Sequence, residues 1–225
     1  MDAWKNQLFF GDNLEILRSG RIPVESVDLI YLDPPFNSKA TYNILFAEKT
    51  GEKSAAQITA FEDTWHWGSE AEAAFDEVMQ YGPVKLRDLL QALLAFLGRN
   101  DMMAYLTMMA VRLVELHRVL KPTGSLYLHC DPTASHYIKM LLDAIFGFVN
   151  FRNEIIWKRT SAHSSAKRYG PVHDVILFYT KTSNFLWNPA YMSHDEKYIK
   201  SHYGLFHFTH VEDIGKIGTC KMPSV

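Results

Sequence analysis

The chain has 225 residues, of which 48% are hydrophobic, and a formal net charge of −2. This length allows one substantial core with a small appendage, and the charge excludes binding of nucleic acid through an overall positive charge. The two cysteines lack the spacing of a disulfide framework or a zinc site, which fits a cytoplasmic protein and predicts no bound metal. The amino-terminal residues lack a signal-peptide pattern, and the most apolar stretch, 89–97, is too short to span a bilayer, so we expect no membrane partner.

The first third of the chain predicts two strands and a helix. A strand is expected at 7–10, and a short helix follows it with Asp12 or Asn13 as its cap. The apolar run 27–32 is typical of a strand buried on both faces of a parallel sheet. From Asn37 to about Gly82 the pattern weakens, which predicts a long loop followed by a short helix.

The rest of the chain alternates more regularly. Apolar periodicity predicts helices at 85–97 and 102–120, then a strand at 125–129, a helix at 132–146, and strands at 153–157 and 175–179. Strands that alternate with helices predict an α/β sheet. Beyond Asn184 the sequence becomes aromatic and polar without a clear period. We therefore expect one domain over 1–183 and the beginning of a second over 184–225.

The tetrapeptide Asp33-Pro34-Pro35-Phe36 directly follows the apolar run 27–32. It lies at the carboxyl end of a predicted central strand, where open α/β sheets place their ligand sites. An ordinary turn at the end of a strand is the alternative interpretation.

These residue types suit the alkylation of an exocyclic amine on a nucleobase. Such an amine is a poor nucleophile because its lone pair is delocalised into the ring, so an enzyme must accept its hydrogen bonds. The Asp33 carboxylate and the Pro34 carbonyl can do this on a backbone stiffened by two prolines, and Phe36 can stack on the base. The base must leave the duplex to reach them. A sulfonium methyl donor such as S-adenosylmethionine supplies the leaving group without a metal.

The motifs Asp33-Pro34-Pro35-Phe36-Asn37-Ser38, Phe61-Glu62-Asp63-Thr64-Trp65 and Leu128-His129-Cys130-Asp131-Pro132-Thr133 resemble those of bacterial DNA methyltransferases that modify adenine N6 or cytosine N4. The segments 153–158 and 173–179 are similar to the stretch that follows the catalytic motif in one subgroup, whose catalytic motif precedes its cofactor motif. Many members of this subgroup are adenine methylases, including the modification subunits of type III restriction systems. The resemblance implies a Rossmann-like methyltransferase sheet with flanking helices.

The resemblance also implies roles for particular residues. Asp33, Pro34, Pro35 and Phe36 become the catalytic and base-stacking set, and Asp33 and Pro34 also adjoin the cofactor, S-adenosylmethionine. Asp12 becomes a candidate contact to the adenosine of that donor. A helix cap is the alternative role for Asp12, with equal weight.

One expected motif is not found. Members of the subgroup hold the methionine part of the donor with a Phe-x-Gly-x-Gly loop near the carboxyl end, whereas Gly215-Lys216-Ile217-Gly218 offers only two glycines. We therefore expect the catalytic domain to be incomplete at its carboxyl terminus, through truncation or because the enzyme is split. A complementing carboxyl-terminal half, a second copy in a homodimer and a restriction subunit are the candidate protein partners.

Basic residues gather between Arg152 and Arg168, interleaved with hydroxyl side chains. Such groups bind backbone phosphates, and the candidate contacts to double-stranded DNA are Lys158, Arg159, Lys167 and Arg168, together with Asn37 beside the catalytic motif. A solvated charged loop is the alternative. For the histidines, including His117 and His129, a structural or surface role is expected rather than metal binding.

The leading hypothesis is a site-specific DNA methyltransferase that acts on adenine N6, with cytosine N4 as the alternative target. The rival hypothesis is a catalytically incomplete DNA-binding fragment, or one subunit of a split methyltransferase. A methylase of protein or RNA ranks last, because such enzymes more often carry Asn in place of Asp33.

Overall fold

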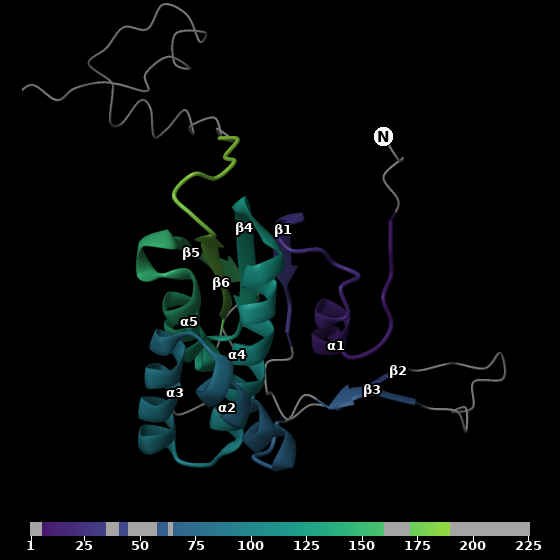
Figure 1. The fold of residues 1–225 in the computed structure, drawn as a ribbon, viewed down its shortest axis with the longest axis vertical. Helices are drawn as coiled ribbons and strands as arrows, with labels where there is room; N and C mark the ends of the chain where they lie inside the picture. The colour runs from purple at the N-terminus through teal and green to yellow at the C-terminus, as the bar shows by residue number, and fades with distance from the viewer. Residues whose placement is uncertain (1–5, 35–40, 45–57, 63–64, 160–171, 190–225) are drawn as a thin grey trace, which may run out of the picture. The chain divides into compact units, whose positions relative to one another are not determined.

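The computed structural model of the chain describes residues 6–34, 41–44, 58–62, 65–159 and 172–189 (Figure 1). The chain divides into two compact units, 1–186 and 187–225. Every helix and strand in the described ranges belongs to the first unit.

A four-stranded sheet forms the centre of this unit. It consists of β1 (Val27–Leu32), β4 (Leu120–Cys130), β6 (His173–Thr180) and β5 (Phe151–Lys158), in the order β1-β4-β6-β5. β1 and β4 are parallel, whereas β6 is antiparallel to β4 and to β5. The carboxyl ends of β1, β4 and β5 therefore meet the amino end of β6 at one edge of the sheet, which we call the carboxyl edge.

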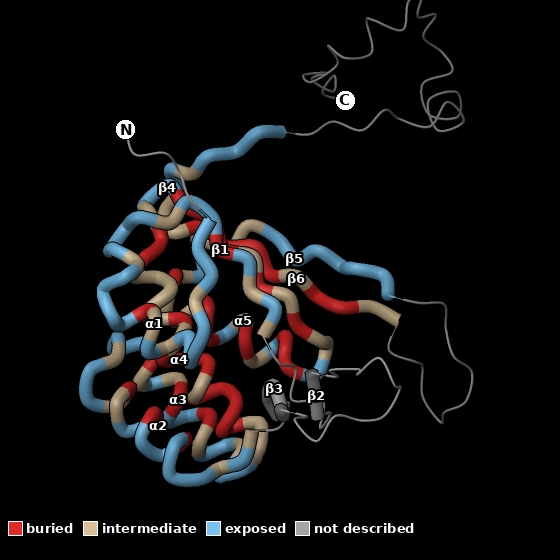
Figure 2. Tube along the Cα trace, turned by 90° about the vertical axis from the view of Figure 1, so that its right-hand side faces the viewer, coloured by how far each residue is buried: buried red, intermediate tan, exposed pale blue. Residues whose placement is uncertain are grey.

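The described helices are α1 (Asn13–Arg18), α2 (Ser69–Tyr81), α3 (Val84–Leu97), α4 (Asp101–Val119), α5 (Pro132–Phe146) and the short 3-10 helix η1 (Phe148–Asn150). α2, α3, α4 and α5 lie together on one side of the sheet (Figure 2). Successive strand residues point to opposite faces, and the β4 residues on the helix-covered face are fully buried: Leu126, Leu128 and Cys130. The core therefore lies between these helices and one face of the sheet, and this α/β arrangement confirms the predicted fold class.

The opposite face of the sheet is less covered. It carries Leu29, Tyr31, Tyr127, His129, Phe178, Ile155 and Trp157, and we call it the open face. Leu29 and Tyr31 are each 57% exposed. The expectation that the strand at 27–32 is buried on both faces is therefore wrong, because β1 is an edge strand of this sheet and the four large helices cover only the other face.

Two further expectations about the first third of the chain are corrected. Residues 7–10 form no strand, and Phe10 is fully exposed. The predicted long loop after Asn37 contains an antiparallel pair, β2 (Thr41–Ile44) with β3 (Ile58–Glu62), before α2 begins. Across the described ranges, no helix is both long and apolar enough to cross a membrane.

Candidate active site

Asp33 follows the last residue of β1 at the carboxyl edge. The parallel register pairs Leu32 with Leu128, so the next residues along the two strands, Asp33 and His129, lie side by side. His129 Nδ1 is 3.0 Å from Asp33 Oδ1, within hydrogen-bonding distance. The Asp33 side chain is 62% exposed. It is therefore held at one oxygen and open to solvent.

The same histidine reaches a second carboxylate. Asp174 is the second residue of β6, and its Oδ2 lies 3.2 Å from His129 Nε2. Arg159, which follows β5, donates from Nη1 to Asp174 Oδ1 at 3.3 Å. The ends of four strands thus bring Asp33, His129, Asp174 and Arg159 into one connected group, which we call the edge network.

The middle of the edge network is buried and its ends are exposed. Exposure is 17% for the His129 side chain and 5% for that of Asp174, whereas that of Arg159 is 51% exposed. A carboxylate withdrawn from water is destabilising unless it is paired and hydrogen-bonded. Asp174 accepts a hydrogen bond from Arg159 on one oxygen, and its other oxygen faces His129 Nε2.

Of the residues predicted for catalysis and donor binding, the described ranges contain Asp33, Pro34 and Asp12. Pro34 follows Asp33 at the carboxyl edge and is partly buried, whereas Pro35 and Phe36 lie outside the described residues. Asp12 Oδ1 accepts hydrogen bonds from the backbone amides of Leu14 and Glu15 and so caps α1. Its Oδ2 accepts from Arg112 Nη2 at 2.9 Å. The cap that the sequence offered as an alternative role is therefore present, and donor contact by Asp12 stays a prediction.

Of the predicted DNA contacts, Lys158 and Arg159 are described, and both lie at the carboxyl edge. Lys158 is exposed at the end of β5, in register with His173. Arg159 is joined to Asp33 through Asp174 and His129, so one of its guanidinium nitrogens already contacts a protein carboxylate. Asn37, Lys167 and Arg168 lie outside the described residues.

Sequence reasoning missed the participation of His129 and Asp174. A signal was available, because each is a polar residue next to an apolar run near the end of its strand. Their contact could not be read from the sequence, because it depends on β6 lying next to β4.

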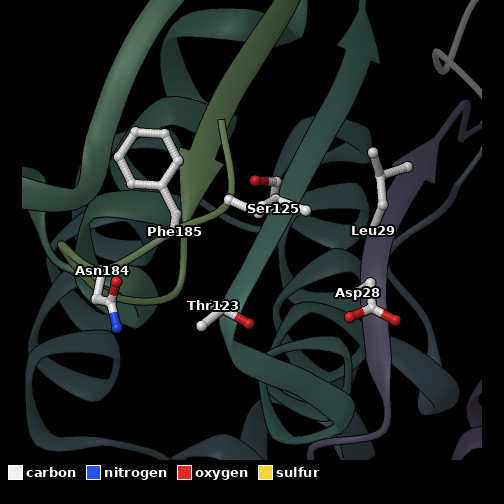
Figure 3. A pocket seen from close by; sticks show the side chains of 7 residues that line it. Asp28, Leu29, Thr123, Ser125, Asn184 and Phe185 are labelled. Atoms are coloured by element: carbon white, nitrogen blue, oxygen red, sulfur yellow. The ribbon is translucent and has the colours of Figure 1, made fainter. Parts of the chain in front are cut away.

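A pocket lies at the other end of the open face, near the amino end of β1 (Figure 3). Its lining comes from β1, from the first half of β4 and from the segment after β6. The lining residues are Asp28, Leu29, Thr123, Ser125, Asn184, Phe185 and Leu186. The carboxylate of Asp28 is already paired with Lys121 Nζ, at 2.7 and 2.8 Å. The pocket is thus separate from the carboxyl edge, where Asp33 lies.

A family model described as DNA methylase, of the N6/N4 methyltransferase type, matches residues 27–214. The chain belongs to the N6/N4 DNA methylase family. The match begins at β1 and includes Asp33, His129, Arg159 and Asp174, so the whole edge network lies within the matched residues. This confirms the resemblance on which the sequence-based prediction was built.

Several relatives resemble this methylase chain. The Mod subunit of the type III restriction-modification enzyme StyLTI from Salmonella typhimurium is 27% identical over 79% of this chain and 24% of its own length. The EcoP15I Mod subunit from Escherichia coli is 24% identical over 80% of this chain and 24% of its own length. The type II methyltransferase M.EcaI from Enterobacter cloacae is 32% identical over 44% and 22% of the two chains. The chain therefore spans about a quarter of the length of these relatives.

Among solved structures, the cytosine-N4-specific PvuII DNA methyltransferase resembles this methylase chain with a TM-score of 0.42 and 13% identity. The match covers 88% of this chain and 61% of that one.

Proposed function

We propose that this chain carries the catalytic residues of an enzyme that transfers a methyl group from S-adenosylmethionine to an exocyclic amine of a base flipped out of duplex DNA. Adenine N6 is the proposed target. Membership of the N6/N4 DNA methylase family supports the reaction class, and the subgroup that the sequence resembles contains many adenine methylases. Cytosine N4 is the alternative, because both amines require the same hydrogen-bond acceptors.

One observation carries the mechanism: the exposed Asp33 carboxylate stands at the carboxyl edge, held at one oxygen by His129. An ionised carboxylate only accepts hydrogen bonds, and its two oxygens offer several acceptor sites. The Asp33 carboxylate can therefore accept an N–H of the target amine while it stays in contact with His129. That contact would draw the nitrogen lone pair out of conjugation. As the N–CH3 bond forms and the S–CH3 bond of the donor breaks, the amine proton would pass to the Asp33 carboxylate or to water.

The neighbouring residues of the motif complete the proposed set. The Pro34 carbonyl would accept the second amine hydrogen, and Pro35 and Phe36 would stiffen the backbone and stack on the base. When bound, S-adenosylmethionine supplies a methyl group on a positively charged sulfur. An exposed carboxylate such as that of Asp33 suits a cationic ligand, whereas the Asp12 carboxylate is already used by α1 and Arg112. We therefore propose that Asp33 and Pro34, rather than Asp12, contact the donor.

Substitution of Asp33 tests this mechanism. We expect Asp33→Ala to lower the single-turnover rate of methyl transfer to duplex oligonucleotides by at least about 10²-fold, the effect typical of losing a positioned acid–base group. The chain is assayed alone and together with a candidate complementing carboxyl-terminal half. Mass spectrometry of digested DNA separates N6-methyladenine from N4-methylcytosine. Transfer that survives Asp33→Ala would show that the mechanism is wrong.

The second candidate function is a DNA-binding part of a split methyltransferase that holds no donor by itself. The observation that favours it is the chain's span of only about a quarter of its relatives' length. Calorimetric titration with S-adenosylmethionine separates the two candidates. Saturable binding supports the catalytic proposal, whereas salt-dependent DNA binding without donor binding supports the second.

The same relatives suggest partners. Two of them are Mod subunits of restriction-modification enzymes, so we propose a restriction subunit as one partner and a second copy of this chain as another. We also propose that residues 184–225 begin the region that recognises the DNA target. Sedimentation of the chain with and without duplex DNA measures the state of assembly.

A further inference from the structure

We propose that His129 is a positioning residue that fixes the Asp33 carboxylate for the target amine, and that Asp174 and Arg159 hold the His129 ring in place from behind. The catalytic consequence of this arrangement rests on the proposed function. The arrangement itself rests only on the edge network and can be tested without any methyl transfer.

The Asp33 carboxylate needs such a restraint because it is exposed at the end of an edge strand. A side chain in that position rotates freely unless another group holds it, and catalytic groups must stay within about 0.5 Å of their productive position. The hydrogen bond from His129 Nδ1 reaches only Oδ1. It can therefore hold the carboxylate while Oδ2 faces an incoming amine.

The His129 ring is suited to hold Asp33 because it is itself fixed. It is mostly buried on the central strand β4, and its Nε2 lies 3.2 Å from the Asp174 carboxylate. Each ring nitrogen thus faces one carboxylate, Nδ1 that of Asp33 and Nε2 that of Asp174. The edge network runs from Asp33 through His129 and Asp174 to Arg159.

Arg159 fixes the far end of the edge network. Its backbone amide donates to the Val172 carbonyl at 2.9 Å, which continues the pairing of β5 with β6 by one residue. Its guanidinium donates to Asp174 Oδ1. The orientation of Asp174, and through it that of His129, is therefore set by the backbone pairing of two strands.

A purely structural role is the alternative to be excluded. In that case the edge network would only fasten β4, β5 and β6 together, and the identity of the nitrogen facing Asp33 would not matter. Two substitutions separate the roles. The amide nitrogen of Asn is the same number of bonds from Cα as Nδ1 of His. The amide nitrogen of Gln is the same number of bonds from Cα as Nε2 of His.

The first experiment compares His129→Asn with His129→Gln in single-turnover methyl transfer, with the chain assayed as for Asp33→Ala. We expect His129→Asn to keep the rate within about threefold, because it still donates to Asp33, and His129→Gln to lower it by about 10-fold to 10²-fold. The KM for DNA should change by less than about twofold in both, since the proposed interaction acts on the reacting groups and not on uniform binding. His136→Asn serves as the surface control, because His136 is exposed on α5. Equal rates for the two His129 variants, whether both fast or both slow, would overturn the proposal.

The second experiment needs no activity. In the chain labelled with ¹⁵N in its histidines, we expect Asp33→Asn to change the Nδ1 signal of His129 more than its Nε2 signal, because Asp33 faces Nδ1. Asp28→Asn is the matched control, because Asp28 is an exposed carboxylate at the other end of the same strand. A His129 Nδ1 signal unaffected by Asp33→Asn would overturn the proposal. If transfer instead survives Asp33→Ala while the Nδ1 signal responds to Asp33→Asn, the proposed function fails and the edge network stands.

Discussion

The two faces of the sheet differ in what their residues do. On the helix-covered face, alternate residues of β4 are aliphatic or thiol side chains with no exposure: Leu126, Leu128 and Cys130. On the open face, the residues between them include Tyr127 and His129, and the edge strand exposes Leu29 and Tyr31. One strand therefore supplies the folding core with one set of side chains and the candidate site with the other.

The two faces also differ in the surroundings that they give to a histidine. His117 of α4 lies on the helix side, with its ring centroid 4.8 Å from that of Phe146, and burial lowers its pKa from the ordinary value. His129 lies between two carboxylates on the open face. The helix side thus disfavours a charged histidine, whereas the carboxyl edge of the open face brings ionisable side chains together. Chemistry that needs an ionised group can be placed at that edge without disturbing the core.

The largest effect expected from this difference is on the reactivity of Cys130. Burial raises the pKa of its thiol to about 12 from an ordinary value near 9, and the carboxylates of Asp131, Glu154 and Asp174 add to the rise. Only the thiolate reacts with alkylating agents, so three pH units lower the reactive fraction at pH 8 by about 10³-fold. We expect iodoacetamide to modify Cys130 about 10³ times more slowly in the folded chain than in urea.

A Cys220→Ser variant makes this measurement specific, because Cys130 is then the single cysteine of the chain. Mass spectrometry at fixed times gives both rates. Complete modification of the folded variant at the rate seen in urea would show that the helix-covered face is open to solvent.

The next effect compares one leucine from each face. Leu128→Ala removes a side chain with no exposure, and we expect it to lower the free energy of unfolding by about 3 kcal/mol, within the usual range for such core truncations. Leu29→Ala makes the same chemical change on the open face and should cost less than about 1 kcal/mol. Urea unfolding followed by tryptophan fluorescence measures both. Similar losses for the two variants would mean that the open face is packed as tightly as the other.

Much of the fold could be predicted because the helices α3, α4 and α5 have strong apolar periodicity and the strands have apolar runs. α2 was harder to delimit, since two of its three buried residues are alanines, Ala71 and Ala74, which give a weak apolar signal. The strand expected at 7–10 failed because a short apolar stretch does not show whether a partner strand exists. The exposure of β1 could not be predicted for a similar reason, because an apolar run does not reveal the edge of a sheet.

The candidate site was predicted in part. Asp33 stood out because it and two prolines directly follow the apolar run of a strand, which is a local signal. His129 and Asp174 gave a weaker signal, a polar residue next to an apolar run. Their contact could not be predicted, because it depends on β6 lying antiparallel between β4 and β5. Arg159 was predicted as a DNA contact from its charge, but its contact with Asp174 requires the same strand order. Local chemistry can thus be read from sequence, whereas contacts made across the sheet cannot.

The smallest effect concerns how stability depends on pH through His117. Burial is the main cause of its lowered pKa, the nearby Lys181 lowers it further, and Glu25 partly opposes the shift. A histidine with a lowered folded pKa binds fewer protons in the folded state than in the unfolded state. Its contribution to stability is therefore full above the unfolded pKa of about 6.5 and is lost as the pH falls from there through the folded pKa.

His117→Gln removes this titrating group from the helix side. We expect the free energy of unfolding to fall less steeply between pH 7 and pH 5 in His117→Gln than in the unmodified chain, by at most about 1.4 kcal/mol per pH unit, the limit for one proton. Urea unfolding at several pH values measures the two slopes, and the exposed His136→Gln should leave the slope unchanged. Identical slopes for all three proteins would mean that the helix side accepts a charged histidine as readily as solvent does. The contrast between the two faces would then rest on packing alone.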